Sequence, residues 1–146
     1  MANKYLNDGD YVFSTIKEAK QLFKDISLAE SGKESSSSRN LGSMFAQYTR
    51  DFGKIVDMET GLDDLGAELD KARVMTDPKK RAEKESQIIE QIKSQIKIIS
   101  DKVTSILTRI SALTESTSIP AENKPSVIRI RNKLSSAIND FRFDWK

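Results

Sequence analysis

Apolar residues recur at alternating steps of three and four in four stretches of the chain, which is the spacing of an amphipathic helix. The first stretch covers about residues 10–30. Asp10 is its expected N-cap, because the carboxylate can accept hydrogen bonds from the first free amides. Phe13 and Leu22 widen the apolar face. That face is formed by Val12, Ile16, Ala19, Phe23 and Ile26.

The second stretch predicts a helix from about Leu41 to Met75. Its apolar seam consists of Leu41, Phe45, Tyr48, Phe52, Ile55, Met58, Leu62, Leu65, Leu69 and Ala72. Gly53, Gly61 and Gly66 lie inside this pattern, and each costs about 1 kcal/mol of helix stability relative to Ala. The helix could therefore kink near Gly61, or it could break into two helices.

The third stretch has the most regular seam. Asp77 suits the N-cap and Pro78 the first helical turn, and the helix is expected to continue to about Thr114. The many β-branched residues do not indicate strands, because alternation by two fails while steps of three and four hold. The seam is Ile89, Ile92, Ile96, Ile99, Val103, Ile106, Ile110 and Leu113.

The fourth stretch begins at Pro125 or Ser126, after a linker that contains Pro120. Its apolar face carries Val127, Ile130, Leu134, Ala137 or Ile138, and Phe141. The helical pattern continues to the last residue without a glycine cap. We therefore expect either a fragment of a longer protein or a terminal helix that frays or docks.

The polar segment over residues 31–40 has nothing to bury and is predicted to be a flexible Ser-rich linker. It separates residues 1–40, an amphipathic helix with its linker, from residues 41–146, a three-helix bundle. One-sided apolar stripes are buried only against one another, and a 3.5-residue repeat favours left-handed packing. We predict an all-α protein: an antiparallel three- or four-helix bundle, left-handed, with long amphipathic helices.

Composition narrows the possible chemistry. The 146 residues contain no Cys and no His, which excludes disulfides, Cys/His zinc sites and imidazole catalysis. Lys and Arg total 24 against 22 Asp and Glu, with the signs interspersed, whereas nucleic-acid-binding proteins usually carry a basic stripe. No stretch approaches the run of about 18 apolar residues that a membrane span needs. We expect a cytoplasmic protein without enzymatic activity, cofactor or metal, and without nucleic acid or a direct membrane span.

The remaining charged and aromatic residues suit protein contacts better than catalysis. Acidic residues between Asp57 and Asp70 do not match a calcium-binding loop and fit a solvated helix face. The aromatic residues at the end of the chain could bind a partner or equally cover the end of the bundle. The candidate partner-binding residues are Phe13, Ile16, Phe23, Arg129, Arg131, Phe141, Phe143 and Trp145.

The last hundred residues combine features of a known domain. They contain a helix with Phe52 and Leu62, a polar turn, a long Ile-rich helix, a Ser- and Pro-containing linker, and the stretch Ser126–Leu134 followed by Phe141. In this order, residues 41–146 resemble the N-terminal three-helix Habc domain of syntaxin-type SNARE proteins. The segment before residue 41 departs from the family, and the chain contains neither a SNARE motif nor a membrane anchor.

The resemblance implies a regulatory domain in vesicle trafficking and membrane fusion, on the cytosolic face of a membrane, which binds a SNARE helix or a trafficking regulator. The pattern itself indicates a helical interaction module whose protein partner presents an amphipathic helix. The bundle would then carry a groove for the partner helix, and the first helix of this chain could occupy that groove in cis. The alternative is a helical assembly or chaperone protein, such as a secretion-system or phage-type subunit. Such a protein would act through self-association as a homo-oligomer or through partner-helix binding.

Overall fold

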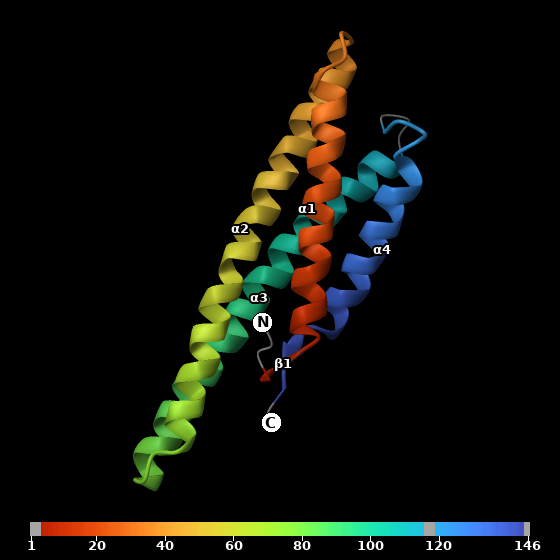
Figure 1. Ribbon diagram of the computed structural model, residues 1–146. Helices are drawn as coiled ribbons and strands as arrows, with labels where there is room; N and C mark the ends of the chain where they lie inside the picture. Colours follow the sequence, from red (N-terminus) through yellow and green to blue (C-terminus); the bar gives the residue numbers. More distant parts are fainter. Residues whose placement is uncertain (1–3, 116–118, 145–146) are drawn as a thin grey trace.

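The computed structural model describes residues 4–115 and 119–144. Within these ranges the elements are β1 (Leu6–Asn7), α1 (Gly9–Ser31), α2 (Ser36–Arg73), α3 (Pro78–Glu115), α4 (Lys124–Asp140) and β2 (Arg142–Phe143). Successive helices run in opposite directions, and α4 returns to lie beside α1 (Figure 1). The prediction of an all-α, antiparallel helical bundle is confirmed, and α1 is its fourth helix.

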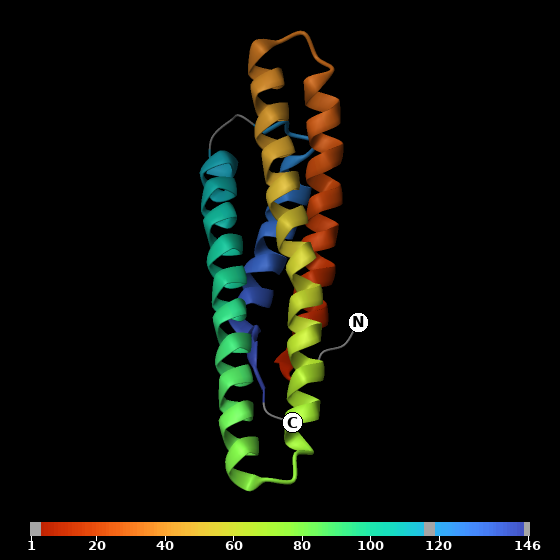
Figure 2. The same ribbon diagram turned by 90° about the vertical axis from the view of Figure 1, so that its left-hand side faces the viewer.

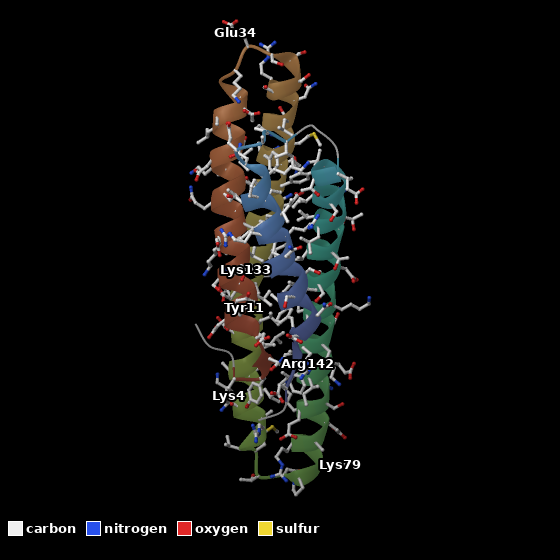
Figure 3. The ribbon with its side chains drawn as sticks, turned by 90° about the vertical axis from the view of Figure 1, so that its right-hand side faces the viewer. Lys4, Tyr11, Glu34, Lys79, Lys133 and Arg142 are labelled. Atoms are coloured by element: carbon white, nitrogen blue, oxygen red, sulfur yellow. The ribbon has the colours of Figure 1, made fainter. Side chains whose placement is uncertain are left out.

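The four helices differ in length, which leaves two hairpins projecting from the bundle. The α1–α2 hairpin extends past α3 and α4 at one end, and the α2–α3 hairpin extends past α1 and α4 at the other (Figures 1 and 2). Figure 3 labels Glu34 at the first tip and Lys79 at the second. α2 and α3 are the longest helices of the described chain, with 38 residues each.

Capping side chains explain where two helices begin. Asp77 caps α3 as predicted, because its Oδ1 accepts from the amide nitrogens of Lys79 at 3.0 Å and Lys80 at 3.3 Å. α2 begins at Ser36 instead of Leu41, since Ser35 accepts a hydrogen bond from the amide of Ser38 at 3.4 Å. The expected flexible linker is thereby shortened to a turn over residues 32–35. The boundary expected at residue 40 lies inside α2.

The start of α1 differs from the expected cap. α1 begins at Gly9, and Asp8 occupies the cap position without a side-chain cap bond. Asp8 has a left-handed backbone conformation with φ 59°, which Asp tolerates better than most residues. This conformation turns the chain sharply from β1 into α1. Asp10, the predicted cap, lies in the first turn.

The fourth helix does not continue to the end of the chain as its pattern predicts. α4 ends at Asp140, and Phe141 is extended, with φ −78° and ψ 107°. β2 then pairs antiparallel with β1, with Leu6 opposite Phe143. Asn7 Nδ2 donates to the carbonyl oxygen of Asp140 at 2.6 Å, which satisfies one of the free carbonyls at the helix end. Strands of two residues are too short to produce a detectable periodicity.

The long helices are continuous, and the buried face of α3 shifts gradually around the helix from one end to the other. α2 passes through Gly61 without interruption, so neither a break nor a new cap occurs there. On α3 the buried positions begin at Ile88 and end at Thr114, where the pattern predicts Ile89 and Leu113. The cause is geometric: an α-helix has 3.6 residues per turn and drifts away from a strict 3.5-residue seam.

The densest part of the core joins α1 to α2 through aromatic rings. Phe23 lies 5.2 Å from Phe45, 5.6 Å from Phe52 and 6.3 Å from Tyr48, measured between ring centroids. All four side chains are buried, and they belong to one hydrophobic core that includes residues of every helix. α1 is therefore an integral part of the bundle.

Candidate partner-binding surface

The candidate residues of α1 lie in the core instead of on the surface. Phe13, Ile16 and Phe23 are at most 2% exposed. Phe13 meets the ring of Phe141 edge to face, with 6.1 Å between centroids. The apolar stripe of α1 is covered by α2 and α4, because a turn of a few residues holds α1 against its neighbour at high effective concentration. These residues present no surface to a partner in this structure.

Arg129 is exposed, but it faces a carboxylate of α1. Arg129 Nη1 lies 3.0 Å from Glu18 Oε1, and Lys133 Nζ lies 2.8 Å from Glu18 Oε2. Lys133 also lies 5.9 Å from the ring centroid of Tyr11, and the two labelled side chains sit together where α4 meets α1 (Figure 3). Hydrogen bonds from Lys133, and then from Arg129, hold the pKa of the Glu18 carboxyl below its ordinary value of 4.5.

Glu18→Gln should lower the free energy of unfolding at neutral pH by less than about 1 kcal/mol, since these partly exposed ion pairs are screened by water. Because the pKa of Glu18 is lower in the folded state, its contribution is present above pH 4.5 and is lost as the pH falls through the folded pKa. The free energy of unfolding of the unchanged chain and of Glu18→Gln is measured by urea denaturation, monitored by circular dichroism, at pH values between 7 and 2. The two stabilities should converge below pH 4.5, and a constant difference would contradict the ion pairing.

Arg131 connects α4 to α3. Its Nη1 donates to Thr114 Oγ1 at 3.0 Å, and the Thr114 hydroxyl donates in turn to the carbonyl oxygen of Ser111 at 2.8 Å. Thr114 is 5% exposed, so the guanidinium satisfies a buried hydroxyl at the end of α3. Both predicted arginines therefore hold α4 in place within the bundle.

The aromatic residues at the end of the chain cover the bundle. Phe141 is buried, and the partly buried Phe143 stacks on Tyr5 with 6.3 Å between centroids and 13° between ring planes. Lys93 of α3 lies 5.9 Å from the centroid of Phe143. Trp145 lies outside the described residues. Of the two roles open for this group, Phe141 and Phe143 take the packing role.

Sequence reasoning missed the residues that fix the short ribbon, β1 and β2, to α2. Tyr5 is 1% exposed, and its hydroxyl donates to Asp70 Oδ1 and accepts from Arg73 Nη1 at 3.2 Å. Lys4 Nζ lies 2.9 Å from the same Asp70 oxygen. The Tyr5 hydrogen bond, and then that of Lys4, lowers the pKa of Asp70. No periodic signal marks Tyr5, because its anchoring depends on a residue 65 positions away.

The surface between α2 and α3 carries a shallow hollow of about 240 Å³. Ile55 and Ile106 form its floor, and both are almost fully buried. Polar side chains form the rim: Asp51, Lys54, Lys102, Ser105 and Arg109. Figure 2 looks onto this face, with α2 and α3 side by side and antiparallel. The hollow is a contact surface shared by two helices, with no enclosed cavity.

The charges on this rim are unbalanced. Lys54, Lys102 and Arg109 form no ion pair within the described parts of the chain. The one carboxylate of the rim belongs to Asp51, and its Oδ1 accepts a hydrogen bond from Gln47 Nε2 at 2.8 Å. By contrast, Arg129 and Lys133 share Glu18. We call the surface formed by the hollow and its rim the α2–α3 groove.

Residues 4–115 and 119–144 contain no group of three or more carboxylates placed to hold a metal ion. Within the same ranges, no helix has the length and apolar character needed to cross a membrane. The groove combines an apolar floor with ammonium and guanidinium groups on its rim. The floor suits apolar side chains of a partner, and the cationic groups suit anionic ones.

Searches with this chain find no matching protein-family model, curated protein or solved structure.

Proposed function

We propose that this protein is a non-enzymatic protein–protein interaction module that binds amphipathic helices, a regulatory domain of the syntaxin type acting in vesicle trafficking and membrane fusion. The proposal rests on the antiparallel bundle together with the resemblance of residues 41–146 to Habc domains. It places the protein in the cytoplasm, at the cytosolic face of a membrane.

The observation that carries this proposal is the way in which α1 is held. α1 lies lengthwise against α2 and α4. Its apolar stripe is buried, and its polar edge is tied to α4 through Glu18. α2 and α4 thus already bind one amphipathic helix in cis. A partner helix would use the same kinds of contact on a face that is still open.

The test is a titration of the full chain with a synthetic peptide of the SNARE type, with heptad-spaced apolar residues around a central Gln or Arg. Backbone amide resonances of the labelled protein report binding. We expect saturable shifts confined to one face of the bundle, because a docked helix contacts only neighbouring helices. The control peptide has the same composition with its apolar spacing scrambled, and it should cause no saturable shifts.

Sedimentation of the unliganded chain at micromolar concentration separates this proposal from the helical assembly protein. A monomer that binds the peptide supports the interaction module. A stable oligomer that ignores the peptide would replace the proposal with self-assembly as the function.

A further inference from the structure

The α2–α3 groove continues beyond its hollow in both directions. Ile98 is 39% exposed and lies one turn from Lys102 on the same face of α3. In the other direction, Met44 is 39% exposed and borders a second hollow together with Leu113, which lies one turn beyond Arg109. Met44 and Ile98 therefore expose apolar surface at the two ends of the basic rim.

The length of this extended groove fits one helix. The distance from Ile98 to Leu113 along α3 is about 22 Å at 1.5 Å per residue, which equals about four helical turns. α2 and α3 run side by side over this length (Figure 2). A helix that lies between two antiparallel helices presents apolar residues every three or four positions to the floor. Its flanking positions then face the two rims.

The charge of the rim selects the partner. The ammonium groups of Lys54 and Lys102 and the guanidinium of Arg109 lie on both sides of the floor, without ion pairs among the described residues. Asp51 keeps its negative charge when Gln47 donates to it, so three cations and one carboxylate give the rim a net charge of +2. Carboxylates at the flanking positions of a bound helix would pair with these cations, whereas lysines there would be repelled.

We infer that the α2–α3 groove binds an acidic amphipathic helix of a protein partner. The partner's apolar stripe packs on the exposed side chains of Met44 and Ile98 and on the aliphatic stems of the rim residues that lie over Ile55 and Ile106. Its carboxylates lie opposite Lys54, Lys102 and Arg109. The inference rests on the proposed function, since it names the face and the partner chemistry of a helix-binding module.

The experiment compares two fluorescent peptides of about four helical turns that share one apolar stripe and carry either Glu or Lys at the flanking positions. Fluorescence anisotropy with the full chain at low salt should give a dissociation constant at least about tenfold lower for the Glu peptide. Added salt should weaken its binding, because the contacts are exposed ion pairs.

Two variants and one control place the peptide on the protein. Lys54→Glu combined with Lys102→Glu should weaken binding of the Glu peptide about tenfold or more, since both sites are exposed. Ser105→Trp should weaken binding of either peptide, because the indole covers the floor and leaves the charges intact. Lys24→Glu reverses a single exposed charge on α1, outside the groove, and should leave the affinity unchanged. Circular dichroism verifies that each variant is folded.

The possible outcomes separate the two proposals. If the Glu peptide binds but the double reversal and Ser105→Trp leave its affinity unchanged, the groove assignment is overturned and the proposed function stands. Equal binding of the Glu and Lys peptides overturns the acidic partner in the same way. If neither these peptides nor the SNARE-type peptide binds, both proposals fall. A dimer of the chain that the double reversal dissociates would make a second copy the occupant and overturn the inference.

Discussion

Phe23→Ala is expected to lower the free energy of unfolding by about 3–5 kcal/mol, the largest loss for a single side chain that we predict here. Phe23 is fully buried and meets the rings of Phe45, Phe52 and Tyr48. The truncation removes these contacts and leaves a cavity between α1 and α2, because two packed helices cannot close around the missing ring. Urea denaturation followed by circular dichroism at 222 nm measures the loss.

The control for this substitution is Leu28→Ala on the same helix. Leu28 is 66% exposed, so its truncation should change the free energy of unfolding by less than about 0.5 kcal/mol. If Phe23→Ala were no more costly than Leu28→Ala, α1 would not be packed into the bundle. The same pair of variants therefore tests whether α1 belongs to the fold or is a detachable segment.

Gly42→Ala is expected to destabilise the protein by about 1–3 kcal/mol, although Ala favours a helix by about 1 kcal/mol over Gly. A Cβ at position 42 would lie 2.9 Å from the amide nitrogen of Ser31 and 3.1 Å from the carbonyl oxygen of Ser27. The backbones of α1 and α2 would have to separate. That movement would weaken the 2.7 Å hydrogen bond that Ser27 Oγ donates to the carbonyl oxygen of Gly42.

Gly61→Ala supplies the matched comparison with the opposite sign. Gly61 lies in the same helix, and no atom lies within 4 Å of the Cβ that Ala would add. The substitution should therefore stabilise the protein by about 1 kcal/mol through helix propensity alone. Thermal and urea unfolding of the two variants measure both signs. A stabilising Gly42→Ala would mean that α1 and α2 are farther apart than described.

Local patterns predicted the helices of this protein well, and the reason is physical. Helix formation and capping depend on residues within about one turn of one another. Asp77 and Pro78 accordingly marked the start of α3. The same reasoning failed for residues 36–40, because Ser35 caps a helix whose first turn is too polar to show any periodicity.

The candidate site was less predictable than the fold. The aromatic and basic residues chosen from the sequence were sensible partner contacts, but Phe23 and Phe141 are core residues and Arg129 already has a partner in Glu18. An amphipathic stripe looks the same whether it is covered in cis or left for another protein. Lys102 lies on the α2–α3 groove, but its position in the sequence does not differ from that of many other charged residues on the polar faces of the helices.

The amino-acid sequence alone determined that this chain forms amphipathic helices, which residues line most of each apolar stripe, and that imidazole and thiol chemistry are absent. Only the tertiary structure decided which apolar stripes pack against each other. Glu18 and Arg129 are 111 residues apart, and the β1–β2 pairing joins the two ends of the described chain. Contacts over such separations depend on how rigid helices pack as whole bodies, and the spacing of residues within any one helix does not encode them. The packing also left Lys54, Lys102 and Arg109 together on one open groove.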